Sequence, residues 1–107
     1  MALRTFADGS LFGTRFGTDR PRVLALHGWG RTHTDFEPVL SGLNALSIDL
    51  PGFGASPAPI DSGGASMYAR LVEPVLDECD LPVVLVGHSF GGRVAVHLNE
   101  RRPAAIA

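Results

Sequence analysis

The sequence predicts an α/β fold of three layers, in which helices cover both faces of a mostly parallel sheet with an antiparallel amino-terminal hairpin. From Arg22 onward, short apolar runs typical of buried strands alternate with stretches typical of helices. Before them, Asp8-Gly9 separates two short runs that alternate in polarity. The chain has 107 residues, 45% hydrophobic and 19% charged, which is typical of one small globular domain.

The amino-terminal stretch predicts two antiparallel edge strands, over residues 3–6 and 10–16. Asp-Gly between alternating runs is a strong hairpin signal, because both residues tolerate the backbone of a tight turn. A turn at residues 19–21 then leads into a buried strand over residues 22–26. This strand is the first of the predicted parallel series.

The next segment predicts a short helix over residues 36–43 and a strand over residues 44–50. Thr34 or Asp35 can cap the helix, and Glu37 can reach back to complete a capping box. The strand follows the helix directly, as in a parallel β-α-β unit.

A loop and a second helix lie between this strand and the last one. Residues 51–64 contain four glycines and three prolines without helical periodicity, which predicts a loop. Ser66 can cap the helix that follows, where apolar residues recur on one face. Pro74 lies inside that pattern, so we expect a kinked or broken helix.

The last third of the chain predicts a strand, a sharp turn and a helix. Residues 82–86 are apolar and β-branched, as in a buried parallel strand, and residues 93–102 form a helical stretch closed by Pro103. The turn between them has the form Gly-x-Ser-x-Gly, and its sequence is Gly87-His88-Ser89-Phe90-Gly91-Gly92. This context is the one that a nucleophile elbow requires.

The glycine spacing in this turn has a steric reason. A strand that reverses directly into a helix forces its apex into a strained conformation and brings the chain close to itself on either side. Gly87 and Gly91 occupy the two close positions, and Gly92 would let the helix pack near the strand. The Ser89 hydroxyl would then project at the carboxyl end of the sheet, near helix N-terminal amides.

Three stretches, each after a predicted strand, carry a family resemblance. They are Leu-His-Gly-Trp-Gly at 26–30, Asp-Leu-Pro-Gly-Phe-Gly-Ala-Ser at 49–56 and the Gly-x-Ser-x-Gly turn at 87–92. Over nearly its whole length the chain resembles the amino-terminal half of an α/β-hydrolase, most of all the carboxylesterase branch that includes pimeloyl-ester esterases. Similar motifs occur in carbon–carbon bond hydrolases, perhydrolases without a cofactor and proline iminopeptidases.

The resemblance implies a site without cofactor or metal. It makes Ser89 the nucleophile and the backbone N–H groups of Trp29 and Phe90 the oxyanion hole. It also implies that Asp49 braces the loop that follows it. The residues that support the site by position are His27, Gly28, Gly87, His88, Gly91 and Gly92.

The resemblance further implies a triad acid and a histidine base, in that order, after Ser89. Only 18 residues follow Ser89, and His97 would lie about 12 Å along the helix at about 1.5 Å per residue. We therefore expect residues 1–107 to be the amino-terminal half of the domain, a truncated fold without later strands, lid, acid and base. Residues 104–107 look like the start of the next strand.

Composition and charge argue against several kinds of binding partner. The net charge is −2 and basic residues are scattered, which argues against nucleic acid. No apolar run approaches the roughly 20 residues of a membrane span, and no signal peptide is evident, so we expect a cytoplasmic protein. Cys79 is the single cysteine and is expected to be buried and inert, while His33 has no metal-ligand spacing.

Two functions are compatible with these residues. In the first, the chain belongs to a serine hydrolase that cleaves ester or related acyl bonds through an acyl-Ser89 intermediate and is inactive alone, because it lacks the base. In the second, it is a non-catalytic half-domain, or one subunit of a split hydrolase, that pairs with a second chain supplying acid and histidine. Acyl transfer in place of hydrolysis is a third alternative.

Overall fold

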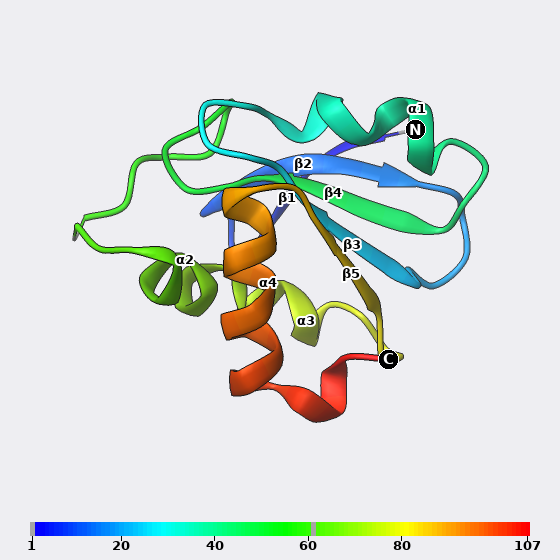
Figure 1. Ribbon diagram of the computed structural model, residues 1–107. Helices are drawn as coiled ribbons and strands as arrows, with labels where there is room; N and C mark the ends of the chain where they lie inside the picture. The colour runs from blue at the N-terminus through cyan, green and yellow to red at the C-terminus, as the bar shows by residue number, and fades with distance from the viewer. Residues whose placement is uncertain (1, 61) are drawn as a thin grey trace.

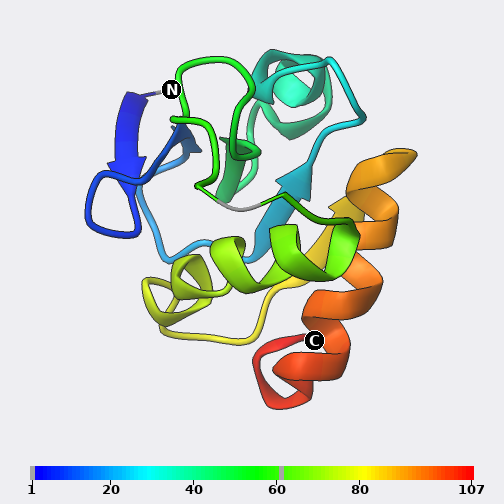
Figure 2. The same ribbon diagram turned by 90° about the vertical axis from the view of Figure 1, so that its left-hand side faces the viewer.

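A five-stranded mixed sheet forms the centre of the computed structural model, which describes residues 2–60 and 62–107. The strands are β1 (Ala2–Phe6), β2 (Leu11–Phe16), β3 (Val23–Leu26), β4 (Ala45–Asp49) and β5 (Val84–Gly87), in the spatial order β1-β2-β4-β3-β5. β3 pairs in parallel with β4 and β5, and helices lie on both faces (Figures 1 and 2). The predicted three-layer α/β architecture is confirmed.

The amino-terminal hairpin forms as predicted, with β1 antiparallel to β2. Its turn places Ala7, Asp8 and Gly9 at φ 51°, 55° and 85°. The expectation of two edge strands is wrong for β2, which also pairs antiparallel with β4. The close approach of β4 requires Gly13, because a Cβ there would lie 2.8 Å from the Cα of Ile48.

The first helical segment is shorter and less regular than the sequence predicts. The predicted 36–43 helix is a 3₁₀ turn followed by one turn of α-helix, and neither Thr34 nor Asp35 caps it. Thr32 is the cap, and its hydroxyl accepts a hydrogen bond from the Thr34 N–H, so the capping box with Glu37 does not form. The helical elements are η1 (His33–Phe36), α1 (Glu37–Leu40), α2 (Ala65–Val72), α3 (Pro74–Asp77), α4 (Phe90–Arg101) and η2 (Pro103–Ala105).

Pro74 divides the second helical stretch in two, as predicted. α2 ends at Val72 and α3 begins at Pro74, which lacks the N–H that would continue the helix. The predicted cap is wrong, because Ser66 already lies inside α2 and the cap position belongs to Gly64, without a side-chain hydrogen bond. The helix starts on the Gly64 carbonyl, which accepts hydrogen bonds from the Met67 and Tyr68 N–H groups.

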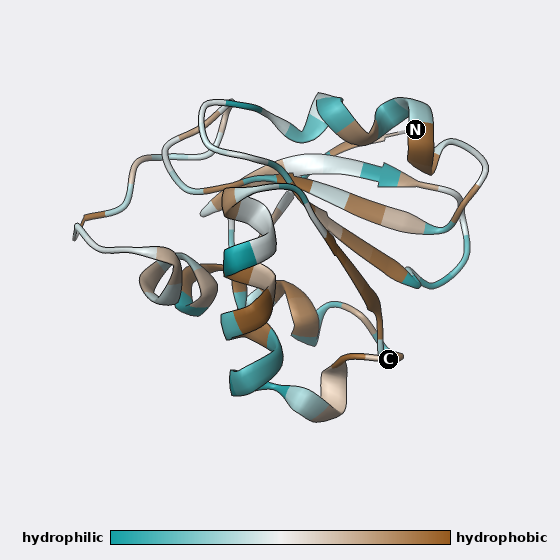
Figure 3. Cartoon of the chain, viewed as in Figure 1, coloured by the Kyte–Doolittle hydropathy of each residue, from teal (hydrophilic) through white to brown (hydrophobic). Residues whose placement is uncertain are grey.

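The two faces of the sheet carry cores of very different size. Leu24, Leu26, Leu46 and Ile48 point to the face covered by α2, α3 and α4, in a cluster of sixteen buried residues. The opposite face, under η1 and α1, has a cluster of five: Phe16, Ala25, Phe36, Leu40 and Ala45. Figure 3 shows the apolar residues along β3, β4 and β5, between these helices.

The edge of β5 that faces away from β3 is almost unpaired among the described residues. Val83, just before β5, forms one parallel bridge with Ile106, and its N–H donates to the Ala105 carbonyl at 3.0 Å. Apart from that bridge, β5 pairs within the described residues only with β3. None of the helices in residues 2–60 and 62–107 has the length and apolar character to cross a membrane.

Candidate active site

Ser89 lies at the turn between β5 and α4, at the carboxyl edge of the sheet. Its backbone has φ 55° and ψ −116°, a left-handed conformation that is strained for a residue with a side chain. Ala7 and Asp8, in the hairpin turn, are the other non-glycine residues with positive φ in the described chain. Ser89 therefore occupies the strained apex that the Gly-x-Ser-x-Gly spacing predicts.

Two glycines make this turn sterically possible. A Cβ at Gly87 would lie 2.5 Å from the Gly92 Cα, and a Cβ at Gly91 would lie 2.5 Å from the His27 carbonyl oxygen and closer still to that of Leu26. A Cβ at Gly92 would meet nothing nearer than 3.5 Å. Gly91, rather than Gly92, therefore sets how closely α4 packs against β3.

The loop after β3 is in contact with the serine turn. A Cβ at Gly28 would lie 3.5 Å from the Ser89 Cβ and 3.1 Å from the His88 Nδ1. The His88 N–H donates to the Leu26 carbonyl at 3.1 Å, which continues the β3–β5 pairing to the edge of the site. The fold thus joins two motifs that lie about 60 residues apart in the sequence.

The backbone amides of Trp29 and Phe90 have no acceptor among the described residues. Within residues 2–60 and 62–107, neither the Trp29 nor the Phe90 N–H donates a hydrogen bond. Phe90 begins α4, where amides at a helix N-terminus favour negative charge. The rings of Trp29 and Phe90 meet edge to face with centroids 5.1 Å apart, so the two residues are neighbours.

An aromatic cluster, which the sequence analysis did not predict, connects the motif loops. The Trp29 ring also lies 4.8 Å from that of Phe53 and 6.1 Å from that of Tyr68, and Tyr68 lies 5.2 Å from Phe90. The Trp29 side chain is nevertheless largely exposed. Nothing in the local sequence around Tyr68 marks it as a partner of the loops, because only the packing of α2 against α4 brings it there.

His27 is buried and engaged at both ring nitrogens. Its Nδ1 lies 2.7 Å from the Gly28 carbonyl oxygen, and its Nε2 accepts the Leu50 N–H at 2.9 Å, which assigns the proton to Nδ1. Burial lowers the pKa of His27, outweighing the hydrogen bond to Gly28 that raises it. The neutral ring therefore ties the loop after β3 to the end of β4.

Asp49 braces the loop after β4, and its partner is unexpected. One carboxylate oxygen accepts the Ala55 N–H at 3.0 Å, and the other lies 2.8 Å from the His33 Nδ1 and accepts the His33 N–H at 2.7 Å. The Ser56 hydroxyl donates to the Asp49 carbonyl at 2.6 Å. No sequence pattern predicts this role for His33, which is the first residue of η1 and lies 16 positions earlier.

The remaining histidines, His33, His88 and His97, have other surroundings. Among the described residues no imidazole is hydrogen-bonded to Ser89, and His97 lies on α4 beside Glu100 at 3.9 Å. His88 is exposed and lines a hollow of about 350 Å³ whose other walls are Arg31, Asp35, Phe36 and Val39. The Arg31 guanidinium donates twice to Asp35, at 2.8 Å each, and lowers the pKa of that carboxyl.

The thiol of Cys79 and the possible metal ligands show no arrangement for chemistry among the described residues. The Cys79 thiol follows α3, donates to the Val75 carbonyl and is half-buried, and burial raises its pKa to about 11. No group of three His, Cys, Asp or Glu side chains in residues 2–60 and 62–107 is arranged to hold a metal ion.

The chain is similar to bacterial esterases and lipases. It is 41% identical over 101 residues to the lipase LipV of Mycobacterium tuberculosis, with 87% of this chain and 37% of the lipase covered. It is 33% identical over 88 residues to the pimeloyl-[acyl-carrier protein] methyl ester esterase of Neisseria meningitidis, covering 77% of this chain and 32% of that enzyme. This chain thus spans about a third of the length of each relative.

The same relationship appears in three dimensions. The crystal structure of the esterase Rv0045c from Mycobacterium tuberculosis superposes with a TM-score of 0.87 at 30% identity, over 98% of this chain and 39% of the esterase. Residues 23–107 match the model of the alpha/beta hydrolase family, from the first parallel strand to the end of the chain. With its fold, its strand order and its serine turn, the chain belongs to the alpha/beta hydrolase family.

Proposed function

We propose that this chain supplies the nucleophile and the oxyanion hole of a serine hydrolase that acts on small esters. The observation that carries the proposal is the strained Ser89 backbone between β5 and α4, and the Trp29 and Phe90 amides, which have no acceptor among the described residues, support it. The esterase and lipase relatives support an ester or a related acyl compound as the substrate class.

In the proposed reaction, the Ser89 Oγ attacks the carbonyl carbon of the ester and passes its proton to a base. The negative charge that develops on the carbonyl oxygen is stabilised by the Trp29 and Phe90 N–H groups, and the loss of one such donor typically lowers turnover about 100- to 1000-fold. The bond to the alkoxy oxygen then breaks and the alcohol leaves with the proton. Water hydrolyses the acyl-Ser89 ester, which releases the acid and restores the serine.

The base has to come from outside the residues described above. His27 is buried with both nitrogens engaged, His33 is paired with Asp49, and His97 lies beside Glu100 along α4. His88 is exposed and forms no hydrogen bond with Ser89 among the described residues. A serine without its base loses turnover on the order of 10⁶-fold. We therefore propose that the 107 residues alone have negligible esterase activity, and that acid and histidine are supplied by a carboxyl-terminal half of the domain.

The first test is the intact mass of the chain after exposure to a fluorophosphonate. Ser89→Ala tests the site, and Ser66→Ala, an exposed serine within α2, is the matched control. We expect the chain alone to label very slowly, and a preparation that holds the complementary half to gain one adduct that Ser89→Ala abolishes and Ser66→Ala retains. Labelling that persists in Ser89→Ala would exclude Ser89 as the nucleophile.

A second candidate function is pairing: the chain would be a half-domain that binds a separate chain through β5. The observation that favours it is the thinly paired edge of that strand, with one bridge at Val83 and a Val84 side chain that is half exposed. An exposed strand edge with apolar side chains is a template for pairing with another strand.

A photo-crosslinking residue at position 84 tests this candidate, with the same residue at Leu3, on the exposed edge strand β1, as control. We expect a defined crosslinked complex from position 84 that labels with fluorophosphonate at Ser89. Crosslinking of equal extent from position 3, or a complex that never labels, would refute the split hydrolase.

A further inference from the structure

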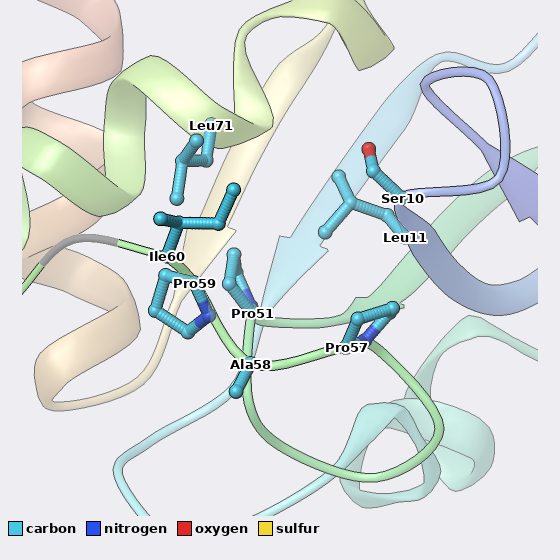
Figure 4. Close-up of a pocket in the computed structure, with 8 residues that line it drawn as sticks. All are labelled: Ser10, Leu11, Pro51, Pro57, Ala58, Pro59, Ile60 and Leu71. Carbon is cyan, nitrogen blue, oxygen red and sulfur yellow. The ribbon is translucent and has the colours of Figure 1, made fainter.

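An apolar hollow of about 320 Å³ lies between the hairpin turn, α2 and the proline-rich loop after β4 (Figure 4). Its volume is near the lower end of pockets that hold small molecules, about 300 Å³. None of its lining residues belongs to the loops around Trp29 or Ser89, so it is distinct from the candidate active site. The lining residues are Ser10, Leu11, Pro51, Pro57, Ala58, Pro59, Ile60 and Leu71.

The walls of this hollow are suited to an aliphatic chain. No lining side chain is charged, and three are prolines, whose rings lose little conformational entropy when a ligand binds. The Ser10 hydroxyl already donates to the Ala7 carbonyl at 2.7 Å. Ile60 is fully exposed and lies between Pro59 and Leu71 in Figure 4, so a ligand there would remove its side chain from water.

A smaller hollow of about 210 Å³ continues from the first. It shares Ile60 and Leu71 and adds Met67 and Arg70, so the lining of the two hollows together is apolar except for Ser10 and one cation. Within residues 2–60 and 62–107, Arg70 forms no ion pair. Arg70 is exposed, so its guanidinium can meet a carboxylate from solution.

We propose that this groove binds a medium-chain carboxylic acid as its anion. The aliphatic chain would lie in the hollow between the prolines, Ile60 and Leu71, and the carboxylate would meet Arg70. The apolar walls alone would accept any aliphatic compound and Arg70 alone would accept any anion, so the two together select an aliphatic acid. The inference does not depend on Ser89 and holds whether or not the chain hydrolyses esters.

The test is a titration of the isotopically labelled chain with octanoate, followed by backbone amide shifts, with octan-1-ol as the uncharged probe. We expect saturable shifts centred on residues 57–60 and 67–71. Ile60→Ser should weaken both probes about five- to tenfold through lost apolar contact. Arg70→Gln should weaken octanoate about two- to fivefold, as for an exposed ion pair, and leave octan-1-ol unchanged.

Two exposed residues of β1 provide matched controls, Leu3→Ser for Ile60→Ser and Arg4→Gln for Arg70→Gln, and neither should change the affinity. Three results would overturn the proposal. They are shifts that do not saturate, shifts centred on Trp29 and Ser89, and binding only to octanoate aggregates or lipid vesicles. Equal octanoate affinity in Arg70→Gln would overturn the assignment of an acid. The location and saturation of the shifts are read on the unmodified chain, so that part of the test depends neither on the folding of a variant nor on esterase activity.

Discussion

The two faces of the sheet are stabilised in different ways. Under α2, α3 and α4, side chains from the strands and helices form a continuous apolar core, and α4 approaches close enough to contact the backbone of β3. Under η1 and α1 the apolar cluster is small, the buried Asp49–His33 pair holds the loops, and Val84 of β5 stays half exposed. One face depends on apolar packing, and the other depends largely on a few polar contacts.

The largest expected effect comes from truncating the same strand pair on opposite faces. Leu24→Ala, in the large core, should lower the free energy of unfolding by about 2–5 kcal/mol through lost burial and a cavity. Val84→Ala, whose position pairs with Val23 on the other face, should cost less than about 1 kcal/mol because half of the side chain is already in water. Urea denaturation measures both, and equal losses would refute the difference between the faces.

The close approach of α4 gives the next effect. Gly91→Ala should destabilise the chain by about 1–3 kcal/mol, since the new methyl group meets the carbonyl oxygens of Leu26 and His27. Gly92→Ala has room for a Cβ, and should be neutral or stabilising by up to about 1 kcal/mol through helix propensity. Thermal unfolding of the two variants compares them, and similar melting temperatures would show that α4 can move away without loss.

On the thinner face, the polar contacts should matter more than exposed charges elsewhere. Asp49→Asn places an amide NH₂ opposite one of the backbone N–H groups from which Asp49 accepts a hydrogen bond. It should lower the free energy of unfolding by about 1–3 kcal/mol, because the side chain is buried. Asp77→Asn, which removes an exposed partner of Arg102 on the other side, should cost less than about 1 kcal/mol. Chemical denaturation at one salt concentration distinguishes them, and a neutral Asp49→Asn would contradict the bracing role.

The smallest effect is a pH dependence at the carboxyl edge, where the two faces meet. Burial lowers the pKa of His27 below its usual value, so the unfolded chain binds the proton more tightly. Stability should therefore be complete above about pH 6.5 and decrease as the pH falls from there. Asp35 and Asp49 oppose this shift and His33 adds to it.

His27→Gln tests the assignment, with His97→Gln on α4 as the control. The free energy of unfolding of His27→Gln should be lower than that of the wild type at neutral pH. Between about pH 7.5 and 5.5 it should fall less steeply than in the wild type. His97→Gln should keep the wild-type slope. An unchanged slope in His27→Gln would mean that another group carries the pH dependence.

The sequence could predict much of this structure because the informative signals are local. The Asp-Gly turn, the apolar runs before residues 27, 50 and 87, and Pro74 each act within a few residues, and the structure confirms the elements that they predict. The predictions of the helix caps were wrong because local residue type does not decide between suitable candidates. Thr34, Asp35 and Ser66 are all suitable caps, and the choice depended on where the chain enters each helix.

The sequence by itself determined the family, the strand–turn–helix at Ser89 and the glycines that such a turn requires. Only the tertiary structure decided that β2 lies inside the sheet, that Gly91 rather than Gly92 sets the helix approach, and that Asp49 pairs with His33. It also decided the groove beside Arg70. These features depend on atoms distant in sequence coming within a few ångströms, and residue patterns along one chain do not encode such distances.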